Sequence, residues 1–434
     1  MNTAFQGSAV FTMAVACAAL GAWTFLLVAR GGFWRARDRD DRGAPAHDPA
    51  VWPSVTAVVP ARNEADMVPR ALASLLAQDY PGIFSVILVD DHSDDGTSEA
   101  ARALAAGSQG APPRLTILAG ATLPPGWTGK LWALNQGIER VQAQQRPPDY
   151  LLLTDADIGY EPDALASLVR RATQQRCVMV SLMAKLRCES LAERALVPAF
   201  IFFFQMLYPF AWVNRPGSRT AAAAGGCVLA QRTALQAAGG VASIRGALID
   251  DCALGARLKQ QGAVWLGLTD RVRSLRAYPG FGDIRRMVAR SAYAQLHYSP
   301  WRLAGTMIGL AIAYLAAPLI AALGPGPARW LAALAWLMMS VAFFPTLRFY
   351  RRSPLWAPLL PAIAAAYLGF TLDSAWQHAR GRGGLWKGRV QAILPSPPTP
   401  LPLAGEGRLM SSSPSPLAQA GKAGAATSPP RTPI

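Results

Sequence analysis

The chain has 434 residues, of which 52% are hydrophobic and only 16% are charged, and its formal net charge is +16. This composition is more apolar than that of an ordinary soluble protein, and the excess of positive charge suggests a polyanionic partner. No RNA-binding motif and no long run of Lys or Arg is present, so a membrane surface is a better partner than a nucleic acid. The five cysteines are scattered without a CxxC pair, which excludes a disulfide framework and a zinc site.

The first feature along the chain is an uncharged segment, residues 9–28, that is long enough to span a bilayer. No basic residue precedes it and no convincing cleavage site follows, so a signal anchor is favoured over a signal peptide. Five arginines lie between residues 30 and 42, and the positive-inside rule then places the following chain in the cytoplasm. We expect a transmembrane anchor over residues 1–29 and a linker over residues 30–53.

A regular alternation of strands and helices follows. The expected strands are residues 55–60, 84–89, 114–118 and 150–154, and the expected helices are residues 64–78, 97–106 and 129–141. Strands that alternate with helices predict an α/β fold with a largely parallel sheet. We assign residues 54–299 to this domain.

Three of these strands end in polar residues: Asn63-Glu64 after the first, Asp90-Asp91 after the second and Asp155-Ala156-Asp157 after the fourth. The carboxyl ends of parallel strands share one edge of the sheet, where open α/β sheets bind ligands. Single acidic residues there can be helix N-caps, as Asp94 or Asp95 is expected to be, but three loops together favour a site. Two carboxylates one residue apart suit a hard divalent cation, Mg²⁺ or Mn²⁺, which also takes phosphate oxygens.

Three later features extend this site. The aromatic segment 196–213 is interpreted as an interfacial element resting on the bilayer near the acceptor, with a buried core helix as the alternative. The small-residue loop 221–226 allows a ligand to approach the backbone closely. Asp250 and Asp251 open an amphipathic helix; they are either helix-capping acids or, for Asp251, a general base.

The C-terminal part contains three uncharged apolar runs, residues 303–323, 330–347 and 355–372. The first two are expected to span the membrane, and the third, with Pro358 and Pro361, is either kinked or re-entrant. A full third crossing would place the arginines after residue 379 outside, against the positive-inside rule. We assign residues 300–376 to membrane segments and residues 377–434 to a basic segment and a tail that is disordered after about residue 394.

The site residues together describe glycosyl transfer from a nucleotide sugar. A cation on Asp155 and Asp157 would neutralise a leaving diphosphate, while Asp90 or Asp91 would hydrogen-bond a ribose or base edge. Asp251 would take the proton of an acceptor hydroxyl, and a single displacement through an oxocarbenium-like state inverts the sugar carbon.

Residues 54–290 resemble the family 2 glycosyltransferases of GT-A fold. The matching motifs are residues 59–64, residues 89–97, Gly129-Lys130 with residues 133–135, residues 155–157, and Asp250-Asp251 with Leu254. The resemblance implies that Pro60, Asn63, Glu64, Asp90, Asp91, Lys130, Asn135 and Asp155 bind the nucleotide sugar, that Asp155 and Asp157 form the metal motif, that Gly225 and Gly226 lie on the acceptor side, and that Asp250, Asp251 and Arg290 serve catalysis.

This resemblance has one departure that bears on function. The family often has a Gln-x-x-Arg-Trp motif after the base, and here residues 287–291 keep only Arg290. Processive polysaccharide synthases rely on that motif, so the loss favours transfer of a single sugar.

Within the family, residues 124–130, 203–210, 225–227 and 386–389 are most similar to the glycosyltransferases associated with hopanoid biosynthesis. This similarity implies a lipid acceptor, such as a hopanoid, and a multi-pass protein of a bacterial inner membrane with a cytoplasmic catalytic domain. A polyprenyl-phosphate sugar synthase and a catalytically inactive membrane scaffold are the alternatives. A nucleotidyltransferase is disfavoured because its Gly-rich N-terminal phosphate loop is missing. No oligomeric state is predicted.

Overall fold

The computed structural model describes residues 2–43, 47–107, 114–382, 385–386 and 389–390. Contacts within the chain divide it into residues 1–394 and residues 395–434. Every described residue belongs to the first unit, so the predicted disordered tail lies outside the described residues.

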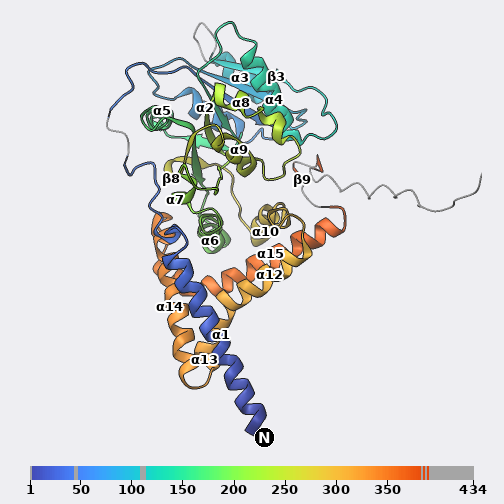
Figure 1. The fold of residues 1–434 in the computed structure, drawn as a ribbon. Coiled ribbons are helices and arrows are strands. Elements are labelled where there is room, and N and C mark those ends of the chain that lie inside the picture. The colour runs from blue at the N-terminus through green and yellow to red at the C-terminus, as the bar shows by residue number, and fades with distance from the viewer. Residues whose placement is uncertain (1, 44–46, 108–113, 383–384, 387–388, 391–434) are drawn as a thin grey trace, which may run out of the picture. The chain divides into compact units, whose positions relative to one another are not determined.

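A mixed sheet organises residues 55–274 and lies in the upper part of Figure 1. It has eight strands in the order β3-β2-β1-β4-β7-β6-β8-β5. The strands are β1 (Val55–Ala61), β2 (Phe84–Asp90), β3 (Leu115–Ala119), β4 (Tyr150–Thr154), β5 (Ile158–Tyr160), β6 (Cys177–Lys185), β7 (Cys227–Gln231) and β8 (Ala263–Ser274). The four predicted strands, β1 to β4, pair in parallel as expected. β7 pairs antiparallel with both β4 and β6, which makes the sheet mixed.

Helices cover both faces of the sheet because its central strands are continuously apolar. Val55, Ala57 and Val59 of β1 pack in one buried cluster with α2 and α5, whereas Val58 packs in the other with α4. Successive side chains of a strand point to opposite faces, so a strand buried on both sides needs an uninterrupted apolar run. The helices of this region are α2 (Val68–Leu76), α3 (Thr97–Gly107), α4 (Gly129–Gln142), α5 (Ala164–Gln174), α6 (Leu191–Leu207), α7 (Phe210–Val213), α8 (Arg232–Ala237), α9 (Asp250–Lys259), α10 (Phe281–Ala289) and α11 (Ala292–Gln295).

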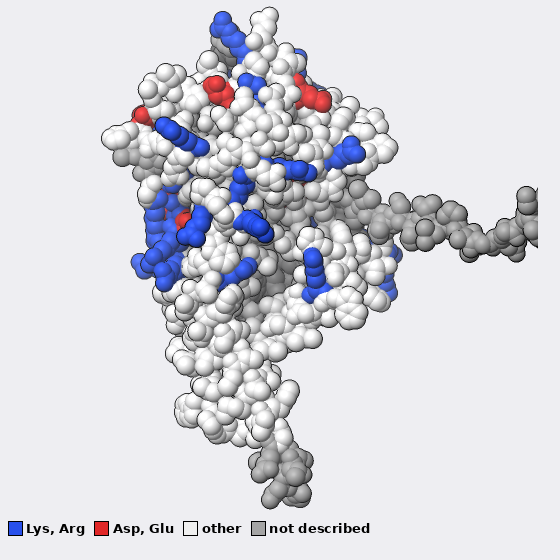
Figure 2. All heavy atoms as spheres, in the orientation of Figure 1, with Lys and Arg blue, Asp and Glu red and all other residues white. Residues whose placement is uncertain are grey.

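Among the residues that the structure describes, five helical segments are long and apolar enough to cross a membrane: Gly7–Val28, Leu191–Val213, Pro300–Leu323, Gly326–Phe349 and Pro354–Ala379. Outside the sheet region they correspond to α1 (Asn2–Val28), α12 (Pro300–Leu310) with a π-helical turn η3 (Ala311–Ala316) and α13 (Ala317–Leu323), α14 (Gly326–Phe349), and a 3-10 turn η4 (Pro354–Leu359) with α15 (Leu360–Ala379). These helices expose large apolar side chains such as Phe11, Trp301 and Trp330. In Figure 2 the face over α13 and over the parts of α1 and α14 beside it shows no charged side chain, whereas Lys and Arg gather above it.

The helix α6 is more buried than an interfacial element would be. Val197, Ile201 and Phe202 are fully buried in the main core cluster. Phe203 packs against Tyr314 of η3 and Tyr367 of α15, with ring centroids 5.8 and 5.0 Å apart. The structure therefore favours the buried-helix alternative: α6 joins the sheet region to the apolar helices.

The chain contacts the sheet region just before the last apolar segment, Pro354–Ala379, and again near the end of that segment. Just before it, the carbonyl oxygen of Phe349 accepts a hydrogen bond from Lys185 Nζ at 3.0 Å. Near its end, Asp373 forms a 3.0 Å ion pair with Arg285, and Ser374 Oγ accepts from the backbone nitrogen of Tyr293 at 3.0 Å. The residues that flank this segment and those near its end therefore both lie against the sheet region.

Candidate functional site

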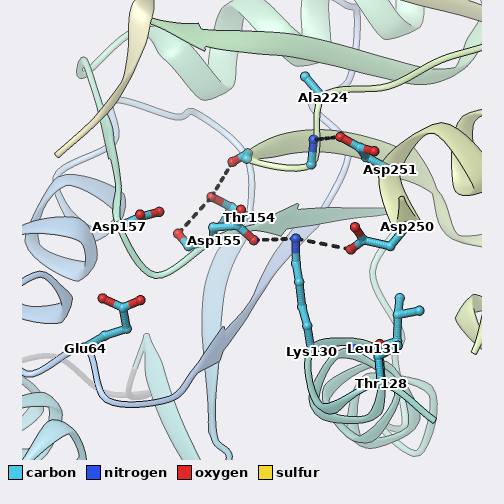
Figure 3. A network of polar contacts seen from close by, with 12 residues as sticks. Glu64, Thr128, Lys130, Leu131, Thr154, Asp155, Asp157, Ala224, Asp250 and Asp251 are labelled. Atoms are coloured by element: carbon cyan, nitrogen blue, oxygen red, sulfur yellow. Dashed lines mark hydrogen bonds and ion pairs between the residues drawn. The ribbon is translucent and has the colours of Figure 1, made fainter. Parts of the chain in front are cut away.

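The centre of the candidate site is Lys130, which joins the end of β4 to the start of α9 (Figure 3). Thr128 caps α4, so that Lys130 stands in its first turn. Its Nζ lies 2.8 Å from Asp155 Oδ1 and 3.2 Å from Asp250 Oδ2. Burial alone would lower the pKa of Lys130, but the two carboxylates outweigh burial and raise it. The lysine is therefore a permanent cation that holds the two acidic segments together.

Asp251 lies on the next position of α9, against the loop that precedes β7. Its Oδ2 accepts a hydrogen bond from the backbone nitrogen of Gly225 at 3.1 Å, and its Oδ1 accepts from that of Cys252 at 2.7 Å. Burial, followed by the charge of Asp250, raises the pKa of Asp251 to about 6. A carboxylate with a pKa just below neutral pH is ionised under working conditions and still basic enough to take a proton.

The glycines of the loop are needed because the backbone passes close to this acid. β7 runs antiparallel to β4 with Cys227 opposite Thr154, which brings residues 225–226 beside Asp155. A Cβ at Gly225 would lie 3.3 Å from both the Cβ of Asp251 and Nζ of Lys130. A larger residue would therefore displace Asp251 or Lys130.

Asp157 and Glu64 are joined by Arg276, a residue that the sequence analysis missed. Arg276 Nε lies 2.7 Å from Asp157 Oδ2, and its NH2 group lies 2.5 and 2.7 Å from the two Glu64 oxygens. Burial opposes the charge of Arg276, but Asp157 and Glu64 together raise its pKa. Arg276 follows β8 and belongs to no motif, so only the pairing of β8 with β5 could have indicated its place.

Five carboxylates and two cationic side chains meet at this edge of the sheet and form the Lys130 cluster. Its members are Glu64, Asp155, Asp157, Asp250, Asp251, Lys130 and Arg276. Burial raises the pKa of Asp155, and the charge of Asp157 adds to this effect. The excess of negative charge fits a bound cation, and carboxylate oxygens are the ligands that Mg²⁺ and Mn²⁺ prefer. No group of three or more metal-ligating side chains occurs among the described residues. Such a site would therefore need oxygens from a bound diphosphate to complete it.

The loops after β1 and β2 are tied to each other. Asn63 Oδ1 accepts from the backbone nitrogen of Asp94 at 3.1 Å, and the nitrogen of Asn63 donates to Ser93 Oγ at 3.0 Å. Both oxygens of Asp90 accept hydrogen bonds, from Ser93 at 2.5 Å and from Ser98 at 2.7 Å. Asp91 is completely buried. The structure thus brings these residues together, with Asp90 organising its own loop.

A second group of predicted site residues lies apart from the Lys130 cluster. Asn135 donates to Glu139 of its own helix at 2.8 Å, and five positions after Lys130 it points about 140° away around the helix. Arg290 is exposed at the end of α10 and, within the described residues, forms no ion pair with the five carboxylates. Pro60 is buried within β1. The geometry gives these three residues no direct place in the cluster.

Comparison with known proteins finds a family model that matches part of the chain. Residues 56–238 match the family model described as Glycosyl transferase family 2. No curated protein matches its sequence at a significant level. The domain match and the glycosyltransferases found among similar structures support a transferase.

A solved structure shows the fold. A mannosyltransferase from Pyrobaculum calidifontis, in complex with GDP-Man and Mn²⁺, is 20% identical with a TM-score of 0.55, over 86% of this chain and 99% of that chain. The likeness shows the GT-A fold. Mannosyl-3-phosphoglycerate synthase from Rubrobacter xylanophilus is 18% identical with a TM-score of 0.34, over 60% of this chain and 75% of that chain.

Proposed function

We propose that the protein is a membrane-bound inverting glycosyltransferase that moves one sugar from a nucleotide-diphosphate sugar to the hydroxyl of a lipid. The observation that carries this proposal is the position of Asp251. Its ionised, half-buried carboxylate lies beside Lys130, which in turn binds Asp155 at the end of β4. Donor-side acids and a base of suitable pKa thus meet at one edge of the sheet.

The reaction follows from these groups. The acceptor oxygen attacks the anomeric carbon of the sugar, and its proton passes to a carboxylate oxygen of Asp251. The bond between that carbon and the diphosphate breaks, and the nucleoside diphosphate leaves with the bonding electron pair. Lys130 keeps Asp155 and Asp250 in place, while Arg276 orients Asp157 and Glu64 on the donor side.

Asp155 and Asp157 would hold the cation, Mg²⁺ or Mn²⁺, together with oxygens of the donor diphosphate. Bound there, the cation would neutralise negative charge on the leaving group. The Mn²⁺ and GDP-Man bound by the Pyrobaculum mannosyltransferase support this choice of cofactor and make GDP-mannose the first donor to test.

We expect the purified protein, in nanodiscs with bacterial lipids, to release nucleoside diphosphate from GDP-mannose or a UDP-sugar. EDTA should abolish the release, and Mn²⁺ or Mg²⁺ should restore it. Asp157→Asn should raise the metal concentration for half-maximal rate by at least about tenfold. Asp163→Asn, which changes an exposed carboxylate paired with Arg271, is the matched control. Full activity in excess EDTA would refute the metal role, and no release from any donor would refute the transferase.

A lipid acceptor is supported by the apolar helices that adjoin the domain and by the resemblance to hopanoid-associated glycosyltransferases. A hopanoid hydroxyl is therefore the first acceptor to examine, in a bacterial inner membrane with the catalytic domain on the cytoplasmic side. A lipid comparison between wild type and a deletion strain identifies the acceptor as the glycosylated species that disappears.

The proposed orientation has α1, the α12–α13 segment and α14 crossing the bilayer, whereas Pro354–Ala379 enters and returns on the cytoplasmic side. This arrangement keeps Arg348 and Arg380 on one side, in accord with the positive-inside rule. An impermeant maleimide should label Ala322→Cys in spheroplasts. It should label Ser353→Cys and Ala379→Cys only after permeabilisation, with the unsubstituted chain as control. Labelling of Ala379→Cys in intact spheroplasts would mean that the last segment crosses fully.

A further inference from the structure

Two cavities share the first turn of α9. The smaller cavity is lined by four members of the Lys130 cluster and by Gly225. The four members are Lys130, Asp155, Asp250 and Asp251. The larger, of about 380 Å³, is lined by the residues that flank this acid pair, Ile249 and Cys252. A molecule in the larger pocket therefore lies next to the proposed base.

The wall of this second pocket is uncharged and mostly apolar. It consists of Tyr208, Gly246, Ala247, Leu248, Ile249, Cys252, Ala294, Gln295, His297 and Tyr298. No Lys, Arg, Asp or Glu is among these residues. The hydroxyl of Tyr208 accepts a hydrogen bond from Gln295 Nε2 at 2.6 Å, which places a polar pair in this mostly apolar wall. Such a pocket suits an amphiphile with few polar groups.

The pocket adjoins the apolar helices. His297 and Tyr298 have φ angles of 52° and 55°, in the left-handed region that residues other than glycine rarely adopt. Tyr298 stacks on His378 with ring centroids 4.3 Å apart. The helix α12 starts at Pro300, and the next residue, Trp301, is 85% exposed. An exposed Trp at the start of an apolar helix is typical of the membrane–water interface, so the pocket lies where a lipid head group would reside.

We propose that this pocket binds the acceptor, and that the acceptor is an amphiphile with an uncharged hydroxyl head rather than a phosphate. The inference rests on the proposed function and adds to it the pocket that would recognise the acceptor. A phosphate head would require Lys or Arg donors, which the pocket wall lacks, and the adjacent Asp250 and Asp251 would repel it. A hydroxyl, in contrast, can donate its proton to Asp251. The polyprenyl-phosphate alternative is thereby disfavoured.

Photo-crosslinking tests the pocket directly. The full chain in nanodiscs is irradiated with a diazirine derivative of hexadecanol, or with the same derivative of hexadecyl phosphate. We expect the alcohol to label residues 246–252 and 294–298, and unlabelled hexadecanol to compete with it. Equal labelling of these residues by the phosphate, or alcohol labelling confined to α1, α13 and α14, would overturn the proposal.

A pocket-filling variant gives a second, kinetic test. Ala294→Trp should lower kcat/KM for transfer to hexadecanol by at least about tenfold, because the indole fills space that the acceptor needs. Donor binding and slow donor hydrolysis should stay at wild-type levels. Ala103→Trp, on the exposed face of α3, is the control. If the donor binds and Ala294→Trp transfers normally, the pocket assignment fails. If wild type binds no nucleotide sugar, the proposed function fails and the pocket assignment with it.

Discussion

Asp251→Asn is expected to abolish transfer and at the same time to stabilise the folded chain at neutral pH. The amide cannot accept the acceptor's proton, so turnover should fall about a thousandfold, within the usual range for loss of a general base. The amide oxygen can still accept the hydrogen bond from Gly225, so nucleotide-sugar binding should persist. Isothermal titration with the donor and a turnover assay on the same preparation measure both effects.

The stability gain follows from the raised pKa of Asp251. Its pKa is about 6 in the folded chain and near 4 in an unfolded chain. A group whose folded pKa is raised contributes stability below its unfolded pKa, and this contribution disappears as the pH rises through the folded value. At pH 8 the buried anion therefore costs at most about 3 kcal/mol. Asn removes this cost, so the variant should gain more in Tm at pH 8 than at pH 5.

Two control variants separate this result from a general effect of replacing a carboxylate by an amide. Asp250→Asn removes one of the two ion-pair partners of Lys130, so it should lower Tm even though it is the neighbouring acid-to-amide change. Asp163→Asn should change neither turnover nor the pH dependence of Tm. Near-normal turnover of Asp251→Asn would contradict the base role and favour a phosphate acceptor, which needs no deprotonation.

The meeting of the polar residues that follow β1, β2 and β4 could be predicted, because the parallel pairing of strands places their ends together. Glu64, Asp90 and Asp155 are far apart in the chain, but β2, β1 and β4 are neighbours in the sheet. In a sheet of parallel strands, the polar residues that follow the strands all lie at the same edge. Lys130 was found through its motif.

Arg276 and the acceptor pocket could not be predicted in the same way. Arg276 and Asp157 are 119 residues apart in the sequence and meet because β5 pairs antiparallel with β8. No short sequence motif indicates this pairing. The pocket combines the end of α6, the loop before α9 and the residues before α12, three segments with no common pattern. Helical phase also separates Asn135 from Lys130, although a shared motif suggested a shared site.

The sequence alone does not determine the path of the last apolar segment, for a related reason. Hydropathy measures the length of an apolar run, and Pro354–Ala379 is long enough to cross a bilayer. Hydropathy carries no information on the contacts of Arg285 with Asp373 and of Tyr293 with Ser374. These contacts hold the end of the segment against the sheet region.

Lys130→Met is expected to be the most damaging single change to the fold of the site. It leaves Asp155, Asp250 and Asp251 close together without the cation that contacts the first two. Removing one partner of a largely buried ion pair typically costs about 3–5 kcal/mol. Since Asp155 and Asp250 are 34% and 23% exposed, we expect a loss near 3 kcal/mol. Chemical denaturation measures this loss, and donor binding should disappear with it.

A double-mutant cycle separates the ion pair from the loss of side-chain volume. Adding Asp250→Asn to Lys130→Met removes one of the repelling charges, so the double variant should be more stable than Lys130→Met alone. Lys185→Met is the matched control, because Lys185 forms a 2.5 Å ion pair with Asp270 outside the Lys130 cluster. It should lower stability and leave donor affinity unchanged. Additive losses in the Lys130–Asp250 cycle would mean that the lysine does not couple β4 to α9, and Asp251 would then need another means of alignment with the donor.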